Sequence, residues 1–297
     1  MDAQVAAVLN QMLERQAIFE QQIACLSFAA QQSPRFLAPT DKGALLELQN
    51  LLTPMTPHGA EFIRVGGAND GGYVMVDRGL AHTIAYNFGI GQEVTWDQAM
   101  AMRGNRVYQY DHTIDAPPEV EGETVFYRLG LGAKTSETMI SLGDALATHH
   151  NETRDDLILN IDIEGGEWDT LPQLGPHDLT PFSQIVMELH HLLRIVEDHA
   201  FRARVHHSLE VLFSTHQIVH VHANNYGARG LADGVMGYDV LEVTLVRKAD
   251  WEFIDCQHLF PRPLDRPNNP FGDEYRLGDW GHSPRQLGEV LRRGARA

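Results

Sequence analysis

Residues 157–171 read LILNIDIEGGEWDTL, and this stretch decides the fold. Its first seven residues form a near-continuous apolar run, which is typical of a strand in the interior of a parallel sheet. The run then passes into acidic residues and two glycines, where we expect the strand to end and the chain to turn toward a helix. A strand of this kind predicts an α/β protein.

The segments on both sides repeat this pattern of a short apolar run, a turn and a helical stretch. Strands are predicted at residues 83–88, 106–110, 125–131, 157–163, 184–189, 217–223 and 239–246, and helices at 94–103, 137–148 and 200–214. This alternation predicts a mostly parallel sheet. The last two strands are joined without a clear helix, so we expect them to form an antiparallel hairpin at one edge of the sheet.

The chain divides into three predicted parts: an N-terminal helical extension (residues 1–58), an α/β domain (59–256) and a proline-rich C-terminal tail or lid (257–297). Apolar side chains in the first 32 residues recur at alternating spacings of four and three, with Gln16 in the one polar slot, which predicts a helix. That helix is expected either to pack on its own domain or to form a coiled-coil arm of a homo-oligomer. A second helix is predicted at 42–52, before two Thr-Pro steps.

The composition narrows the class of protein. The chain has 297 residues, with 40 Asp+Glu against 23 Lys+Arg, 16 His, 2 Cys and a formal net charge of −17. This acidic balance argues against nucleic acid or an anionic membrane as a partner, because phosphates need a basic surface. Two cysteines are too few for a disulfide framework, no run of about 18 apolar residues occurs, and the first residues do not resemble a signal peptide. We therefore expect a cytoplasmic protein that acts on a small molecule.

The first strand–turn–helix unit predicts a nucleotide-type site. Gly89 and Gly91 follow the strand at 83–88, and glycines in such a turn let the backbone approach a ligand closely. Asp111 ends the next strand, about twenty residues after Gly91, where an acid accepts hydrogen bonds from ribose hydroxyls. No third glycine falls at the dinucleotide spacing, which counts against NAD. The alternative interpretation is that Asp111 is a solvated turn residue.

The later strands end in carboxylates and imidazoles. The period-2 geometry of a strand places the polar side chains of each strand on one side: Asn160, Asp162 and Glu164 on the first, Glu188 and His190 on the second, and His220 and His222 on the third. Acids and imidazoles at the ends of neighbouring strands predict a metal site or an acid–base site. The alternative is that the acids cap the next helix and the histidines are hydrogen-bonded core residues.

Several of these segments resemble a known family. NIDIEGGEWDTL (160–171) resembles the D-x-E-G-x-E element of the FkbM-like family of S-adenosylmethionine-dependent methyltransferases. A wider set of segments is similar to a branch called methyltransferase-like proteins: DGGYV (70–74), YNFGIG (86–91), YDHT (110–113), MELH (187–190), HVHANN (220–225) and EVTLVRK (242–248). The resemblance covers residues 60–270, and its most specific part is the combination of DIEGGEW with HVHANN.

The resemblance implies a Rossmann-like class I methyltransferase fold, with a seven-stranded, mostly parallel sheet and an antiparallel edge. It implies that Asn87, Gly89 and Gly91 hold the methionine part of S-adenosylmethionine. Asp111 would bind the ribose, and residues 129–132 would flank the adenine. The sequence departs from the usual E/D-x-G-x-G-x-G motif, because Asn87 stands where an acid is common and Glu93 where the third glycine falls.

The glycine-rich segment at residues 60–77 allows two interpretations. One is a glycine hairpin with Tyr73 as an ordinary core residue. The other is a loop that folds over the cofactor, with Arg64 or Tyr73 touching its carboxylate. Tyr73 is therefore included among the candidate cofactor-binding residues.

The activity implied is transfer of a methyl group to a hydroxyl of a small polar acceptor, such as a sugar or a natural product. Some class I O-methyltransferases hold a divalent metal on the carboxylates that end strands four and five, which here are Asp162 and Glu188, with His190 and His222 as additional ligands. Mg²⁺ or Mn²⁺ is expected ahead of Zn²⁺ or Fe²⁺. Asp162, His190 and Glu164 are the candidate catalytic residues, with His190 or Glu164 as the base that removes the hydroxyl proton.

Three other functions stay open on the sequence. The first is N-methylation of a small molecule, because a nitrogen nucleophile needs less activation. The second is a metallohydrolase built from the same Asp, Glu and His strand ends, although a hydrolase needs no ribose anchor at Asp111. The third is a non-catalytic cofactor-binding protein that assembles through the N-terminal helix.

Overall fold

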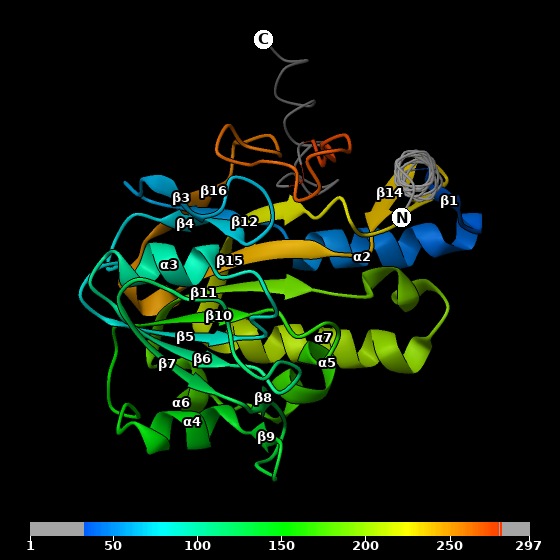
Figure 1. Ribbon diagram of the computed structural model, residues 1–297. Helices are drawn as coiled ribbons and strands as arrows, with labels where there is room; N and C mark the ends of the chain where they lie inside the picture. The colour runs from blue at the N-terminus through cyan, green and yellow to red at the C-terminus, as the bar shows by residue number, and fades with distance from the viewer. Residues whose placement is uncertain (1–32, 279, 281–297) are drawn as a thin grey trace, which may run out of the picture.

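A seven-stranded sheet forms the centre of the protein in the computed structural model, which describes residues 33–278 and 280 (Figure 1). The strand order is β12-β15-β11-β10-β5-β6-β7. Five strands are parallel: β5 (Ile84–Phe88), β6 (Arg106–Tyr110), β7 (Glu123–Tyr127), β10 (Leu157–Ile161) and β11 (Phe182–Leu189). The helix expected in the first 32 residues, and with it the homo-oligomer arm, lies outside the described residues.

The remaining two sheet strands form the edge. β15 (Leu241–Arg247) is antiparallel to both of its neighbours, β11 and β12 (His216–Ala223). The chain therefore places its last sheet strand between two earlier ones. The predicted mixed α/β fold, with a seven-stranded, mostly parallel sheet and an antiparallel hairpin at one edge, is confirmed.

Each face of the sheet carries its own layer. The hairpin of β3 (Phe62–Gly66) and β4 (Gly72–Val76) covers one face together with α3 (Thr95–Ala101). The other face packs against α2 (Lys42–Leu51), α4 (Leu142–Thr148), α5 (Glu167–Thr170), α6 (Pro176–Leu179) and α7 (His199–Thr215). Along β10, Ile158 belongs to the first core and Leu159 to the second. Burial on both faces explains why this strand is a continuous apolar run.

The region after β7 differs from the prediction. The expected strand at 125–131 is broken into β7 and β8 (Gly130–Leu131), and β8 pairs with β9 (Met139–Ile140) outside the main sheet. The helix expected at 137–148 begins only at Leu142. The reason is its N-cap, because the Ser141 hydroxyl accepts a hydrogen bond from the backbone N–H of Asp144 and fixes the start of the helix there.

Short elements complete the described chain. They are β1 (Arg35–Phe36), β2 (Met55–Pro57), β13 (Arg229–Ala232), β14 (Val235–Tyr238) and β16 (Phe253–Asp255), with 3₁₀ turns at Pro39–Asp41, Leu171–Gln173, Leu192–Val196 and Lys248–Asp250. No helix in the described part is both long and apolar enough to cross a membrane.

The described residues of both flanking parts, 33–58 and 257–278, pack on the same domain. Leu45 and Leu48 of α2 lie in the same apolar core as the sheet strands. Residues 257–278, which we call the strap, cross over the β12 side of the sheet, and Phe260 and Tyr275 are buried in that core. The strap also contacts polar side chains of the edge strands, because Glu274 pairs with His222 of β12 and Asn268 donates to Glu242 of β15.

Candidate functional site

Two adjoining cavities open at the carboxyl ends of the parallel strands. The first has a volume of about 530 Å³ and the second of about 480 Å³. Asp70, Asp162 and Glu164 line both of them. This edge of an open α/β sheet is where ligands usually bind, and both volumes lie in the range of small-molecule sites, about 300–1,000 Å³.

The turn after β5 forms the floor of the first cavity. Gly89 has a φ of +88°, and a Cβ atom there would lie only 1.6 Å from the backbone oxygen of Asp162. Gly91 has a φ of +53°, and a Cβ at that position would meet open space. Gly89 is thus required because the backbone that follows β10 approaches it closely. The absence of a side chain at Gly91 leaves open space in the first cavity.

Asp111, at the end of β6, fixes this turn. Its Oδ2 accepts a hydrogen bond from the Gly91 N–H at 2.8 Å, and its Oδ1 accepts from the backbone and hydroxyl of Thr113 at 2.7 and 2.6 Å. Burial alone would raise the pKa of Asp111, but these hydrogen bonds outweigh it and lower the pKa below its ordinary value. An ionised acid next to a glycine turn can accept further hydrogen bonds from a diol.

One part of the first cavity wall is apolar. Ile90, Leu131 and Met139 line it together with Gly130. Gly130 and Leu131 lie in the 129–132 stretch that the family resemblance places beside the adenine. An apolar slot beside an ionised acid and a glycine turn suits a nucleoside.

Two residues predicted to contact a cofactor lie elsewhere. The Asn87 side chain is buried beneath α3, where its Nδ2 donates to Asp97 at 2.7 Å. Tyr73 is buried in the core between the sheet and α3. Burial and the nearby carboxylates of Asp162 and Glu188 raise the pKa of Tyr73 well above its ordinary value. Neither side chain lines the first cavity, because period-2 geometry turns both toward the covered face of the sheet.

The second cavity lies beside a row of polar groups that runs across the sheet. Glu188 of β11 stands directly opposite Glu242 of β15, and Glu242 stands opposite His222 of β12. Asp162 directly follows β10, one residue beyond the pair formed by Ile161 and Met187. The register therefore brings carboxylates from neighbouring strand ends to one place, as predicted for Asp162 and Glu188.

His190 faces these carboxylates. Its Nε2 lies 3.4 Å from Glu188 Oε2, 3.5 Å from Glu164 Oε2 and 3.6 Å from Asp162 Oδ1. Its Nδ1 lies 3.0 Å from Oε1 of Glu167. Burial alone would lower the pKa of His190, but the surrounding carboxylates, Glu167 foremost, raise it. The structure thus brings together all three predicted catalytic residues, with Glu164 as the exposed member at the mouth.

The carboxylates of this group are short of partners. Asp162 Oδ1 is buried without a hydrogen-bond partner among the described residues, and Glu188 accepts only from Nδ2 of Asn224, at 3.1 and 3.2 Å. Burial, with the neighbouring acids, raises the pKa of Asp162 to about 7 and that of Glu188 well above its ordinary value. Asp162, Glu188 and His190 offer ligand atoms that all lie within 4.8 Å of one another. A cation would relieve this excess of negative charge.

The structure does not place His222 with these ligands. Its Nδ1 lies 2.8 Å from Glu242 Oε2 and its Nε2 lies 3.0 Å from Glu274 Oε1, so both ring nitrogens are occupied. Burial alone would lower the pKa of His222, but the two carboxylates raise it to about 10. A doubly protonated imidazole has no lone pair for a metal. The prediction that His222 binds a metal is therefore wrong, and His222 instead forms ion pairs with Glu242 of β15 and Glu274 of the strap.

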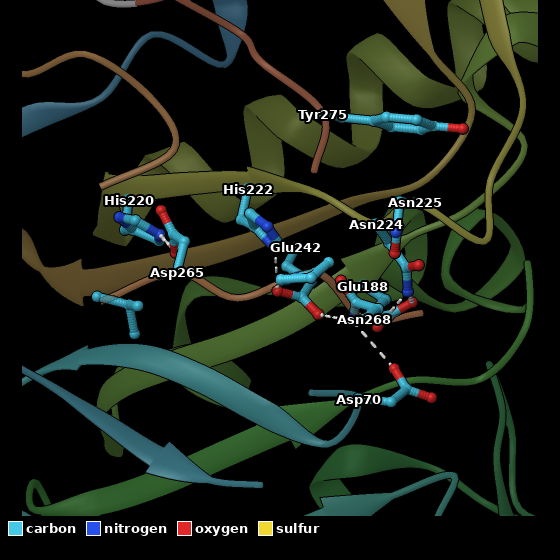
Figure 2. Close-up of polar contacts among 12 residues, drawn as sticks. Asp70, Glu188, His220, His222, Asn224, Asn225, Glu242, Asp265, Asn268 and Tyr275 are labelled. Atoms are coloured by element: carbon cyan, nitrogen blue, oxygen red, sulfur yellow. Dashed lines mark hydrogen bonds and ion pairs between the residues drawn. The ribbon is translucent and has the colours of Figure 1, made fainter. Parts of the chain in front are cut away.

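Sequence reasoning missed several residues of the site. Glu242 and Asp70 form a second acidic group with Glu188, again with oxygens within 4.8 Å of one another. Asn268 of the strap donates to Asp70 at 3.0 Å and also to Glu242, as Figure 2 shows. Glu242 lies on the same face of β15 as Thr244, and only the insertion of β15 beside β11 brings it to the site. No sequence pattern around Asn268 predicts the contacts of the strap with Asp70 and Glu242.

The glycine segment at residues 60–77 is a hairpin whose turn is held from two sides. Arg64 donates from Nε to the carbonyl of Gly67 at 2.7 Å and from Nη2 to that of Asn69 at 2.6 Å. Asn69 in turn donates to the carbonyl of Pro267 in the strap at 2.8 Å. Arg64 therefore positions the turn that carries Asp70, and the hairpin interpretation is confirmed.

Comparisons with known proteins add little to this geometry. No family model and no curated protein matches the chain. One similar solved structure is a precorrin 8w decarboxylase from Methanobacterium thermoautotrophicum, with a TM-score of 0.29 and 15% sequence identity, over 56% of this chain and 82% of that one. A likeness this loose bears on neither the activity nor the ligands of this chain.

Proposed function

We propose that the protein is an S-adenosylmethionine-dependent methyltransferase that methylates a hydroxyl group of a small polar acceptor. The observation that carries the proposal is the pair of adjoining cavities, one lined for a nucleoside and one lined by acids and an imidazole, which share Asp162. A donor and an acceptor in these two cavities would meet at the shared wall. The sheet order, in which the last strand β15 is inserted antiparallel between β11 and β12, also supports a class I methyltransferase.

The first cavity has the groups that this cofactor needs. Asp111 would accept hydrogen bonds from the ribose, Ile90, Leu131 and Met139 would enclose the adenine, and the space at Gly91 would admit the methionine portion. The cofactor, when bound, supplies an electrophilic methyl group on a sulfonium. The acids shared by the two cavities favour a positively charged group at their junction.

A divalent metal fits the second cavity. Asp162, Glu188 and His190 would hold it, and Asp162 Oδ1 accepts no hydrogen bond from the described residues that a metal would have to displace. Two carboxylates with one imidazole suit Mg²⁺ or Mn²⁺ better than a thiolate-seeking ion. When bound, the metal lowers the pKa of a coordinated hydroxyl and orients it.

The residues of the chain then divide the work of proton transfer. Nε2 of His190 is the atom that would hold the metal, because Nδ1 contacts Glu167, so this nitrogen is not free to take the hydroxyl proton. Glu164 lines both cavities at the exposed mouth, so it is the group placed to take the hydroxyl proton and to pass it to solvent. Proximity and alignment supply the rest of the acceleration.

The lining of the second cavity restricts the charge of the acceptor. Its described wall carries the carboxylates of Asp70, Asp162, Glu164, Glu188 and Asp239 and contains no Lys or Arg. Phosphorylated or carboxylated acceptors would be repelled, so a neutral or cationic polyol is the substrate class that fits. An amine acceptor of the same size would fit as well, and N-methylation is the second candidate.

A metallohydrolase is the main rival, because the Asp162, Glu188 and His190 group alone would serve it. The glycine turn and the Asp111 network of the first cavity have no role in such an enzyme. Labelled S-adenosylmethionine incubated with neutral sugars, polyols and amines, with and without a chelator, separates the alternatives. Label transfer that needs Asp111 supports the methyltransferase. Absence of transfer together with failure to bind S-adenosylhomocysteine would defeat it.

A further inference from the structure

Glu167 is fully buried beside the site and lines neither cavity. Its Oε1 accepts a hydrogen bond from the backbone N–H of Ile163 at 3.2 Å and lies 3.0 Å from Nδ1 of His190. Its Oε2 is buried without a hydrogen-bond partner among the described residues. A carboxylate held so far from solvent, with one oxygen on an imidazole, acts chiefly on that imidazole.

The local backbone explains how Glu167 reaches His190. After β10 the chain passes through Glu164 and Gly165, whose φ angles of +54° and +101° lie in the left-handed region and fold the chain back. A Cβ at Gly165 would lie 2.7 Å from the ring of His191, so the turn packs directly against the end of β11. The E-G-G-E spacing thus places Glu167 under the last residues of that strand.

His190 is held at two points by consecutive residues. Glu167 contacts the ring at Nδ1, and the indole Nε1 of Trp168 donates to the backbone oxygen of His190 at 2.7 Å. The His190 side chain is only 7% exposed, and its Nε2 makes no hydrogen bond within the described part of the protein. The ring therefore has one fixed nitrogen and one directed at the acidic group.

We propose that Glu167 is the positioning residue that sets the tautomer of His190. Its Oε1 accepts a hydrogen bond from the Nδ1–H group, so the proton of the neutral ring stays on Nδ1. The lone pair then lies on Nε2 and faces the acceptor cavity. This inference rests on the proposed function, because that lone pair is what a metal requires. Without Glu167 the opposite tautomer is favoured, since Nε2 faces three carboxylate oxygens at 3.4–3.6 Å that would accept its proton.

The first test reads the tautomer directly. Nitrogen NMR of protein labelled with ¹⁵N-histidine, free of metal and taken upward in pH until the His190 signal stops changing, reports which nitrogen of the neutral ring carries the proton. The His190 signal is assigned from its loss in His190→Gln. The wild-type protein is expected to show the Nδ1–H form, and Glu167→Met is expected to shift His190 to the Nε2–H form. An Nε2–H form in the wild-type protein would overturn the proposal.

The second test measures Mn²⁺ affinity by electron paramagnetic resonance, without any substrate. Loss of the carboxylate partner of a metal-binding histidine lowers metal affinity about 10- to 100-fold, and this is the fall expected for Glu167→Met. Trp168→Phe is the matched control, because it removes the contact to the His190 backbone but leaves the ring contact. It is expected to retain both the tautomer and the affinity.

Glu167→Gln guards against misfolding of the apolar variant. It keeps the packing but loses the charge, so Mn²⁺ affinity is expected to fall about tenfold. A folded Glu167→Met or Glu167→Gln protein with wild-type Mn²⁺ affinity would overturn the proposal. Binding of S-adenosylhomocysteine, followed by calorimetry in every variant, distinguishes this outcome from failure of the proposed function, because that ligand belongs to the other cavity.

Discussion

Replacement of Gly89 by alanine tests the contact on which both cavities depend. The new Cβ would lie 1.6 Å from the backbone oxygen of Asp162 and 2.6 Å from its carbonyl carbon. Both atoms belong to backbone, so no side-chain rotation relieves the clash. The turn after β5 and the end of β10 must move apart, and Asp162 moves with them.

The magnitude follows from two contributions. Placing alanine at a φ of +88° costs about 1–2 kcal/mol, and forcing extra volume into a packed contact costs a further 1–3 kcal/mol, so we expect a loss of about 2–5 kcal/mol, centred near 3–4 kcal/mol. Gly91→Ala is the matched control from the same turn. Its φ is +53° and its Cβ meets nothing within 4 Å, so only the conformational cost of about 1 kcal/mol applies.

The assay is thermal unfolding of both variants beside the wild-type protein. For a domain of this size each kcal/mol changes the Tm by about 2–4 °C, so Gly89→Ala is expected to melt about 10 °C lower and Gly91→Ala only a few degrees lower. Mn²⁺ binding is expected to weaken in Gly89→Ala alone, because only that change displaces Asp162. Equal stabilities of the two variants would refute this account of the turn.

Three further predictions concern charged groups. His222→Gln leaves Glu242 and Glu274 without their cation, so unfolding free energy is expected to fall by about 3–5 kcal/mol while Mn²⁺ affinity is unchanged; a large loss of affinity would return His222 to the metal ligands. Burial lowers the pKa of His216 to about 4, so the folded state favours the neutral ring. Protonation of His216 is therefore expected to lower the free energy of unfolding by about 3 kcal/mol as the pH falls from 6.5 to 4. That loss should be absent in His216→Gln, and equal pH slopes would contradict it. Mg²⁺ is expected to raise the Tm of the wild-type protein but not of Asp162→Asn, and an equal rise in both would place the ion elsewhere.

The sequence predicts the sheet well because its strands are buried on both faces. Continuous apolar runs such as 157–161 report that burial directly, and the strand ends could be located from them. Asp162, Glu188 and His190 were brought together correctly, since the ends of adjacent parallel strands meet at one edge. These features can be predicted because they depend on the local sequence of each strand and not on the order of the strands in the sheet.

Residues that depend on long-range order could not be predicted. Glu242 joins the site only because β15 inserts between β11 and β12, and nothing in its own segment specifies that order. His222 was expected to bind metal, but Glu274 of the strap, 52 residues later, occupies its second nitrogen. Asn87 lies in β5, two residues before Gly89, yet the pleat directs its side chain toward Asp97 beneath α3.

The central claim is that the first cavity binds the methyl-donor cofactor, and calorimetric titration with S-adenosylhomocysteine tests it most directly. One site per chain is predicted, and Asp111→Ala is expected to weaken binding about tenfold or more through the lost hydrogen bonds to the ribose. Gln92→Ala, on the same cavity wall but outside the Asp111 network, serves as the control. Saturable binding that depends on Asp111 would support the account, and an absence of binding to the folded wild-type protein would contradict it.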